Sequence, residues 1–534
     1  MNQFTHVGLV VPGNNTFNLS HDVKLTCDGG YLVPCLIEEV LPGDVFRYRN
    51  SILTRLTPLV QPMMHKVDVS VQAAFIPTRI LWQNFEKFMS NPVPDPSTPV
   101  APYLTNIQVP VGSLAEYLGL PTNDVYDEAT GGLYHQHSGI EYASALPFAA
   151  YQKFFSDWYQ PVNLGPTTPF VELTDGSNDT RLAELATLHK RGWQHDYFTA
   201  ASIAPQAGQP VVVPIGDQAP VILDPARNSE GMYVRQANRN NYATVGDRQI
   251  VNAVDGAPSP YGFFESPANI PADLDPRGRL IADLSGATGV DVETLRWSIT
   301  LQQFLERNNL GGTRYIELNL IHWGVKSSDA RLQRVELIGS SSNPVVISEV
   351  LQTSASLEDT TPLGEMGGHG LSFGKNGFRQ YRAEEHGFYI AVVSIRPKTG
   401  YSQGVSRMWT RKTPLDYPWP TFAGLGEQTV KLRELYYQAI YSEEDFGYQP
   451  RYSEYRYSPS RICGEFRTTL APWTMTRIFR DRPALNKAFV ECTPTERVFA
   501  VQGDGTHSYL LQINHSLTVS RKLPKYGVPG VGQV

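Results

Sequence analysis

The strongest structural constraint in the chain is an alternating stretch at residues 67–75, VDVSVQAAF, which is followed by Pro77. Successive side chains of a β-strand point to opposite faces, so this stretch predicts a strand with one buried face. Because proline cannot donate a hydrogen bond to a ladder, we expect the strand to leave the sheet at Pro77, with a short amphipathic helix at residues 80–88. Together with turn signals such as Pro42-Gly43-Asp44, this pattern favours a β-sandwich or barrel.

The rest of the chain contains more strand patterns. Glycine and proline number 44 and 40, about 16% of the chain against a typical ~12%, which favours many turns and long loops over helical bundles. A nearly continuous apolar run at residues 388–395 predicts a strand buried on both faces. Further strands are expected at residues 315–320, 335–339 and 345–350, and a closing strand that lies near the first ones is expected at residues 509–519.

Helices are expected mainly between the strands. Ser113 and Glu116 have capping-box spacing and predict the start of a short helix. Three further helices are expected at residues 142–159, with the true first turn at Pro147, at 181–189, and at 297–305, with its end at 308–312. Residues 427–441 fit either a short helix or an extended segment.

Charge and cysteine usage narrow the range of functions. The formal net charge is −7, so any contact with nucleic acid must come from a local patch of Lys and Arg. The cysteines Cys27, Cys35, Cys463 and Cys492 show no CxxC spacing, which predicts buried reduced thiols. The first residues lack the charged start and apolar core of a signal peptide, so we expect the chain to be made and kept in a reducing cytosol.

Residues 215–292 differ in character from the rest of the chain. They are rich in Gly, Pro, Asn and Asp and have few periodic apolar runs. A structureless loop of this length is improbable inside a compact domain, so we expect a functional excursion or a small subdomain. The alternative is a disordered surface loop without a role.

Three patterns that could carry chemistry have more ordinary interpretations. Gly370-Leu-Ser372-Phe-Gly374 matches a nucleophile elbow, but glycines surround it where an apolar strand and a helix are required, so a flexible glycine loop is favoured over a serine hydrolase. His135 and His137 could share one face of a strand and bind zinc or copper, although loop histidines bonded to backbone or to a neighbouring subunit are favoured. The carboxylate pairs are expected on solvated faces with nothing to raise a pKa: Glu38 and Glu39, Glu384 and Glu385, Glu443 and Glu444. We therefore predict no catalytic residue, no metal and no cofactor.

The segment from Arg451 to Arg482 mixes arginines with tyrosine, phenylalanine and tryptophan. Single-stranded nucleic acid is bound in this way, because bases stack on aromatic rings while guanidinium groups neutralise phosphates. The same composition suits protein interfaces. The DNA-facing candidates are Arg451, Arg456, Arg461 and Arg467.

Several long sequence segments resemble those of a known family. They are GYLVPCLIEEVLPGD, PMMHKVDVSVQAAFIPTRILWQNFEKFM, LHKRGWQHDYFT, LERNNLGGTRYIELNLIHWGV, SSDARLQRVELIG, YPWPTFAGLGEQ and EDFGYQPRYSEYRYSPSRICGEFRTTL. In this order they resemble the major capsid proteins of the Microviridae, the small single-stranded DNA phages, and most closely the gokushovirus type. The resemblance spans nearly the whole chain.

The resemblance implies a mainly β fold, an eight-stranded antiparallel jelly roll with long loop insertions and a few short α-helices. It implies a T = 1 icosahedral shell of sixty copies around circular single-stranded DNA. The expected organisation is an N-terminal arm at 1–20, a first part of the core at 21–214, a surface insertion at 215–292 and a second part of the core at 293–534.

In this family the insertion forms protrusions at the three-fold axes, which implies Asp224, Arg227, Tyr233, Arg239, Tyr261, Phe263 and Phe264 as protrusion residues. The implied partners are an internal scaffolding protein, a small basic DNA-binding protein, a pilot protein and a bacterial host receptor. The chain is then expected in the virion, and in the host cytoplasm during assembly. A glycan-binding β-sandwich and a serine hydrolase at Ser372 are the rival hypotheses.

Overall fold

The computed structural model divides into two compact units, one formed by Met1–Ala207 with Glu306–Val534 and one by Gly208–Leu305. The described residues are 13–90, 98–161, 164, 169–208, 211, 221–223, 233–236, 272–275, 280–282, 292–312, 315–324, 326, 328–329, 332–351, 366–503 and 505–525.

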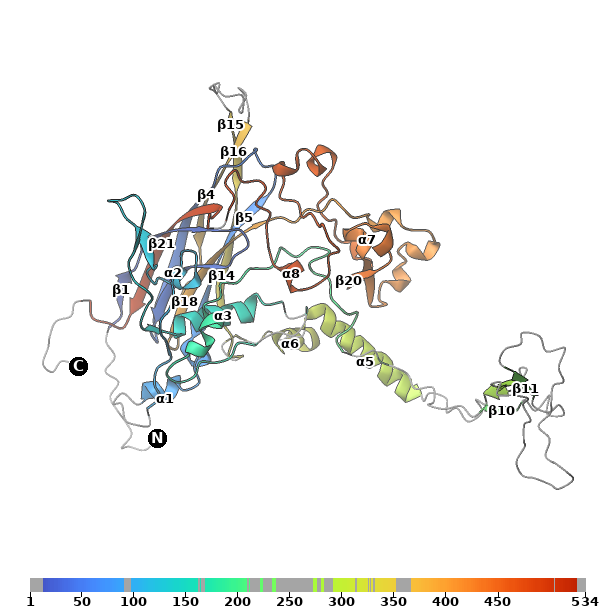
Figure 1. Cartoon of the computed structure of the whole chain (residues 1–534). Coiled ribbons are helices and arrows are strands. Elements are labelled where there is room, and N and C mark those ends of the chain that lie inside the picture. The colour runs from blue at the N-terminus through green and yellow to red at the C-terminus, as the bar shows by residue number, and fades with distance from the viewer. Residues whose placement is uncertain are drawn as a thin grey trace, which may run out of the picture. The chain divides into compact units, whose positions relative to one another are not determined.

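The larger unit contains two antiparallel sheets (Figure 1). The seven-stranded sheet has the order β1-β21-β4-β16-β15, with β2 paired to β21 and β17 paired to β4. Its strands are β1 (Asn15–Asn18), β2 (His21–Cys27), β4 (Val45–Leu56), β15 (Val346–Leu351), β16 (Met366–Gly377), β17 (Tyr381–Arg382) and β21 (Tyr509–Arg521). The four-stranded sheet has the order β14-β5-β18-β3 and consists of β3 (Val33–Val40), β5 (Val67–Pro77), β14 (Glu336–Pro344) and β18 (Gly387–Pro397).

The connections between these strands define a jelly roll. The strands β2, β21, β4 and β16 are neighbours in one sheet, and β3, β18, β5 and β14 are neighbours in the other. When these eight strands are taken in chain order, each step changes sheet except the step from β5 to β14. Eight strands that alternate in this way between two antiparallel sheets form a jelly roll, so the expected fold class is confirmed.

A hydrophobic core fills the space between the two sheets. It includes Phe46 and Ile52 from β4, Val71 from β5, Val393 from β18 and Ile513 from β21. The closing strand β21 pairs with β1, β2 and β4, as expected, and its side chains alternate between buried and exposed over most of its length. Residues Asn15–Asn18 of the expected arm are therefore a strand of this sheet, while residues 1–12 lie outside the described part.

The four-stranded sheet is also covered on its other face. There, Ala74, Ile76, Ile390 and Val392 pack in a second hydrophobic cluster with α3 (Leu146–Trp158). Strand β18 is thus buried on both faces, as predicted. The prediction of one buried face for residues 67–75 is wrong, because α3 and its neighbours cover the second face of β5. Strand β5 ends at Pro77, as expected.

Two long insertions interrupt the jelly roll. The first joins β5 to β14 and contains α1 (Phe85–Ser90), β6 (Tyr103–Leu104), α2 (Leu114–Tyr117), β7 (Asp124–Tyr126), β8 (Leu133–His135), β9 (Ala143–Ser144), α3, α4 (Leu182–Leu185), β10 (Val221–Leu223), β11 (Tyr233–Gln236), β12 (Ala272–Asp275), β13 (Leu280–Ala282), α5 (Val292–Gly311) and α6 (Tyr315–Trp323). The second joins β18 to β21 and contains β19 (Glu427–Lys431), α7 (Leu432–Leu435), β20 (Asp445–Pro450) and α8 (Lys487–Val490). Buried side chains of the second insertion, including Val430, Leu435 and Phe446, form a third cluster together with Tyr197 and Phe198 of the first insertion.

Most helix starts follow their sequence signals. Helix α3 begins at Leu146 with Pro147 in its first turn, as expected. The Ser113 hydroxyl caps α2 by accepting from the Glu116 N–H at 3.4 Å, whereas the Glu116 carboxylate accepts from the Gly112 N–H and not from that of Ser113. Helix α5 ends at Gly311 beside Gly312, whose φ of 103° suits glycine. Helix α4 is shorter than the expected 181–189.

The strand predicted at residues 315–320 is wrong, because these residues begin helix α6. An apolar alternation of six residues is too short to distinguish the period of a strand from that of a helix, so tertiary contacts decide which of the two forms. The His322 ring accordingly contacts the Asn308 side chain on α5 at 2.6 Å. Residues 427–441 contain both of the expected alternatives, strand β19 and then helix α7.

In the smaller unit, the described residues form two antiparallel ladders, β10 with β13 and β11 with β12. Among the residues described, no helix is both long enough and apolar enough to span a lipid bilayer.

Candidate functional site

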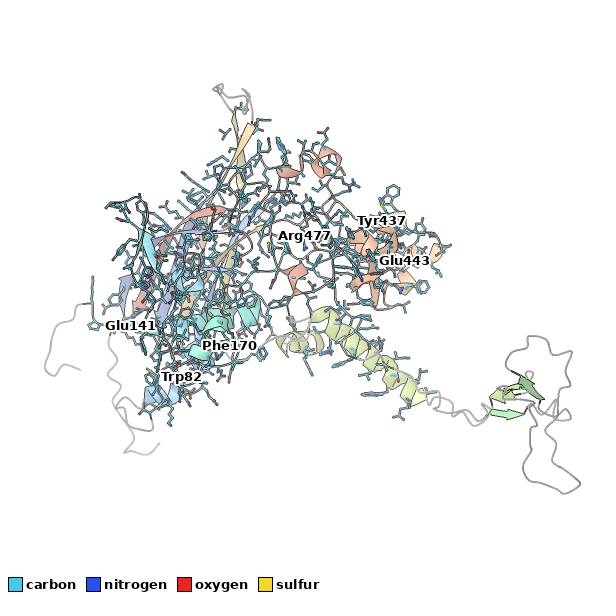
Figure 2. The ribbon with its side chains drawn as sticks, viewed as in Figure 1. Trp82, Glu141, Phe170, Tyr437, Glu443 and Arg477 are labelled. Atoms are coloured by element: carbon cyan, nitrogen blue, oxygen red, sulfur yellow. The ribbon has the colours of Figure 1, made fainter. Side chains whose placement is uncertain are left out.

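The insertion between β18 and β21 exposes many large apolar side chains (Figure 2). Ile440 is 84% exposed and Trp409 is 74% exposed. We call the following set the exposed apolar set: Met408, Trp409, Leu415, Tyr417, Trp419, Leu425, Tyr437 and Ile440. Soluble monomers rarely expose so much apolar surface in one segment, and Trp, Tyr and Met are enriched where proteins bind each other.

A partly buried charge network supports this segment. The Arg411 guanidinium lies 3.5 Å from Glu454 and stacks on Tyr455 at 4.8 Å and on Tyr417 at 5.3 Å. Arg407 donates to the carbonyl of Thr429 at 3.0 Å. Because these contacts join distant parts of the insertion, the exposed rings stand on an ordered base rather than on a free loop.

A buried carboxylate completes the network. Glu434 accepts a hydrogen bond from the Tyr197 hydroxyl at 3.1 Å, and Arg407 lies 3.9 Å away. Burial raises the pKa of Glu434, and the positive charge of Arg407 opposes that rise. The network therefore connects α7 to residues that precede the jelly-roll strand β14, across the larger unit.

The arginines between Arg451 and Arg482 do not form one surface. Arg477 is half-buried, and its guanidinium stacks on Phe489 at 4.2 Å and on Trp193 at 5.0 Å and donates to the carbonyl of Phe489. Its role is structural. Among the DNA-facing candidates, Arg456, Arg461 and Arg467 are exposed and Arg451 is half-buried.

Arg467 is exposed but already engaged, since it donates to the carbonyls of Ile462 and Ser402. Arg451 lies over the ring of Tyr452 at 5.9 Å. The DNA-facing assignment stays a prediction.

Ser372 lies in the middle of strand β16 and not in a glycine loop, so the expected loop is wrong. Its side chain is buried, and its hydroxyl donates to the carbonyl of Pro344 at 2.8 Å. His369 is exposed on the opposite face of the strand. The serine is therefore neither strained nor adjacent to a base, as a nucleophile elbow requires.

His137 lies in a loop and contacts the backbone, as the ordinary interpretation expects, whereas His135 lies in strand β8 and contacts a side chain. His135 contacts the Asp124 carboxylate at 2.9 Å, and His137 contacts the Pro121 carbonyl at 3.2 Å. Within the described ranges, no group of three or more His, Cys, Asp or Glu is arranged to hold a metal ion.

Two predictions about ionisable residues need correction. Burial raises the pKa of Glu38, although His21 and Arg521 oppose the rise, because this carboxylate lies on a half-buried strand. Cys463 is exposed, whereas Cys27, Cys35 and Cys492 are buried, and all are free thiols.

The protrusion candidates fall mostly outside the described residues. Tyr233 lies in β11. The positions of Asp224, Arg227, Arg239, Tyr261, Phe263 and Phe264 are among those that the structure does not describe.

Sequence reasoning missed the exposed apolar set. A usable signal was present, because Trp409, Tyr417 and Trp419 stand among prolines in a segment with neither helical nor strand periodicity. Aromatic rings outside a helix or strand are not placed on a buried face by the periodicity of that element, so exposure could have been expected.

A jelly roll that carries an ordered, exposed aromatic segment is suited to association with other proteins through its surface. Comparison with known proteins identifies the class further. The family model described as "Capsid protein (F protein)" matches residues 11–531. The chain belongs to this family of phage capsid proteins.

Three relatives share this description in their names. The chain is 33% identical to capsid protein VP1 of Bdellovibrio phage phiMH2K, covering 98% of this chain and 97% of that protein. It is 31% identical to capsid protein VP1 of Chlamydia phage 1, covering 100% and 98%. It is 27% identical to capsid protein VP1 of Spiroplasma virus 4, covering 97% and 95%.

These findings confirm the resemblance to gokushovirus-type capsid proteins of the Microviridae. The chain is a major capsid protein that assembles with itself and is located in the virion; it is a structural protein and not an enzyme.

Proposed function

We propose that sixty copies of this chain close into a T = 1 icosahedral shell around the circular single-stranded DNA of a small bacteriophage. The exposed apolar set carries this proposal, because side chains such as Ile440 and Trp409 gain free energy only when a neighbouring copy covers them. Closed symmetry lets one sequence make every contact of such a shell.

Assembly takes place in the host cytoplasm and uses further partners. These are an internal scaffolding protein, a small basic DNA-binding protein and a pilot protein. Residues 215–292 form outward protrusions at the three-fold axes and govern either attachment to the bacterial receptor or the stability of the particle. The protrusion residues are Asp224, Arg227, Tyr233, Arg239, Tyr261, Phe263 and Phe264.

The exposed apolar set provides a direct test of assembly. Ile440→Asp and Trp409→Asp place a charge where the side chain is already in water, so the free subunit should keep its fold and its melting temperature. In the shell the same charge would be buried without a partner, which costs several kcal/mol at each of many interfaces.

We therefore expect sedimentation and electron microscopy to find particles of about 3.6 MDa, which is 60 × 59.5 kDa, for the unchanged chain and at least tenfold fewer for both variants. Ile440→Leu and Trp409→Phe are the matched controls and should assemble. Normal particle yields from both Asp variants would show that this surface is not an interface.

The arginine candidates test the genome contact. Replacing Arg456 and Arg461 together by serine should lower the amount of nuclease-resistant DNA per particle. It should also make the binding of DNA less dependent on salt concentration, because each phosphate contact releases counterions. Arg480→Ser, another exposed arginine of the segment, is the control. Unchanged DNA content in the double variant would remove these residues from the genome contact.

A further inference from the structure

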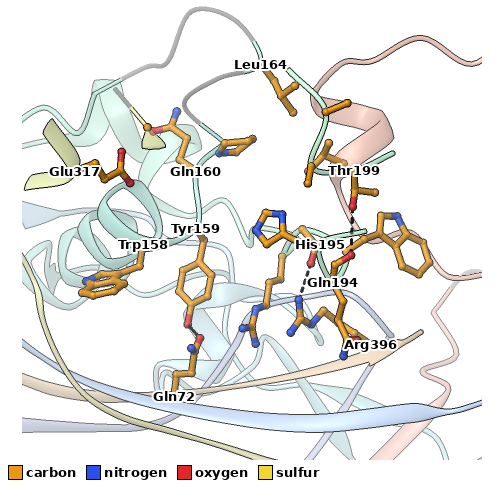
Figure 3. Close-up of a pocket in the computed structure, with 18 of the residues that line it drawn as sticks. Gln72, Trp158, Tyr159, Gln160, Leu164, Gln194, His195, Thr199, Glu317 and Arg396 are labelled. Carbon is orange, nitrogen blue, oxygen red and sulfur yellow. Dashed lines mark hydrogen bonds between the residues drawn. The ribbon is translucent and has the colours of Figure 1, made fainter. Parts of the chain in front are cut away.

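A polar cavity of about 780 Å³ lies in the larger unit, beside the four-stranded sheet (Figure 3). Its lining includes Gln72 from β5, Arg396 from β18, Tyr159 just after α3, and Arg191, Gln194 and His195 from the segment after α4. The cavity shares no residue with the exposed apolar set or with Arg451–Arg482.

Two arginines dominate the charge of this cavity. Arg191 donates through one nitrogen to the hydroxyls of Ser70 at 2.8 Å and of Ser394 at 2.9 Å, and its guanidinium lies over the Tyr159 ring at 5.4 Å. Arg396 donates to the carbonyl of Gly192 at 2.9 Å, while its Nε–H is buried and has no hydrogen-bond partner. Each guanidinium is therefore held in place with donors to spare.

Neither guanidinium has an ion-pair partner among the described residues. Asp68 lies opposite Arg396 in the β5–β18 ladder, but its carboxylate accepts from the Gln194 amide at 3.1 Å and lies 3.5 Å from Lys66. Burial lowers the pKa of Arg191, and burial together with repulsion from Arg191 lowers the pKa of Arg396 to about 10. The attraction of Asp68 offsets only part of this effect on Arg396. Two neighbouring, partly buried positive charges without an ion pair are unfavourable, and a bound anion would neutralise them.

The other lining groups indicate what kind of anion fits. A guanidinium fork matches the oxygens of a phosphate. The Gln72 oxygen accepts from the Tyr159 hydroxyl and the Gln194 nitrogen donates to Asp68, so the other amide atoms and the His195 ring are the groups that could bond to or stack on a base. The cavity volume falls within the usual range for small-molecule sites. The one carboxylate in the lining, Glu317, lies at the other side of the cavity from Arg396 in Figure 3.

We propose that this cavity binds the phosphate of a nucleotide through Arg191 and Arg396, with the base against the amide side chains and His195. The source is the single-stranded DNA genome, and this part rests on the proposed function. The cavity would then hold one nucleotide of the genome in each subunit.

The test uses the full chain as free subunits, so it does not depend on shell formation. Thermal unfolding is followed with dAMP, deoxyadenosine, inorganic phosphate and a short oligo(dA). Because a ligand that binds only the folded state raises the melting temperature, we expect dAMP and oligo(dA) to raise it by several degrees at saturation, and deoxyadenosine to have no effect. No shift with dAMP, or an equal shift with inorganic phosphate, would overturn the nucleotide site.

Two variants locate the binding. His195 is exposed, so His195→Glu should fold normally and place a carboxylate at the cavity, lowering the apparent affinity for dAMP at least tenfold. Arg396→Met should do the same by removing a positive charge. The control is His135→Glu, which adds the same charge at an exposed histidine far along the chain on β8.

Equal affinity of the His195→Glu and His135→Glu variants would place the nucleotide elsewhere. Binding of dAMP without binding of oligo(dA) would overturn the genome as its source. Failure of the shell itself would appear only in sedimentation and microscopy, so the two proposals can fail separately.

Discussion

Single residues in this protein serve the fold more often than their motifs suggest. The Ser372 hydroxyl already donates a hydrogen bond to the carbonyl of Pro344 inside the sandwich. Ser372→Ala should therefore destabilise the subunit by about 1 kcal/mol, the usual net value of such a bond, as measured by chemical denaturation. A fluorophosphonate probe should label neither the variant nor the unchanged chain at this position; labelling of Ser372 would revive the hydrolase hypothesis.

A buried histidine should make the subunit sensitive to acid. His515 in β21 is fully buried, bonds to the Tyr48 hydroxyl at 2.9 Å and stacks on that ring. Burial, aided by His21, lowers the pKa of His515 to about 4, below its unfolded value of about 6.5. The folded state therefore gains stability from this residue above pH 6.5 and loses it as the pH falls towards 4.

The resulting loss of unfolding free energy between pH 6.5 and 4 should reach on the order of 3 kcal/mol. His515→Gln should flatten the fall in melting temperature between pH 6.5 and 4, because glutamine does not titrate. The control is His135→Gln at an exposed position, and its melting temperature should depend on pH as that of the unchanged chain does. Identical pH curves for His515→Gln and the unchanged chain would contradict this account.

At the scale of elements, the two sheets differ in how many of their faces are buried. Strand β21 has one face in the core and one in water, so Leu511 is 3% exposed and its neighbour Leu510 is 44% exposed. Leu511→Ala should cost about 2–5 kcal/mol of unfolding free energy, and Leu510→Ala well under half of that. Urea denaturation of the free subunits measures both.

Strand β18 should behave differently, because α3 covers its second face. Ile390 packs in the α3 cluster and Ile395 packs in the core between the sheets, and both are fully buried. Either residue replaced by alanine should cost about 2–5 kcal/mol. A small cost for Ile390→Ala would mean that the α3 layer contributes little to the sheet.

At the scale of the whole molecule, the unit Gly208–Leu305 should be removable. Its described strands pair only with one another, and the pairing of Val221 with Ala282 brings the two ends of the segment together. Replacing residues 221–282 by a short Gly-Ser linker should leave the melting temperature of the jelly roll within a few degrees, because closing a loop costs little.

Particles of this deletion variant should adsorb to the host at least tenfold less, or lose heat resistance. A smaller deletion, of residues 237–271 alone, keeps both ladders and tests the tip. Unchanged adsorption and heat resistance in both variants would refute the proposed role of residues 215–292.

Fold prediction succeeded where a pattern covers a whole element. The alternation at residues 509–519, the apolar run at 388–395 and Pro147 each specify one structure without help from distant residues. It failed for residues 315–320, where a six-residue pattern fits two periods. The candidate sites were harder, since Arg191 and Arg396 are 205 residues apart and nothing local shows that they share a cavity.

The mainly β class of the fold, several single elements and the resemblance to the capsid family could be inferred from the amino-acid sequence, because local periodicity and long matching segments can be read without coordinates. The covered faces could be inferred for β18 but not for β5. Three features depend on side chains brought together from distant segments. They are the burial of β5 on both faces, the hydrogen bond from the Ser372 hydroxyl to the carbonyl of Pro344, and the lack of a counter-ion at particular arginines. Burial and electrostatic compensation are properties of packing, so only the tertiary structure decides them.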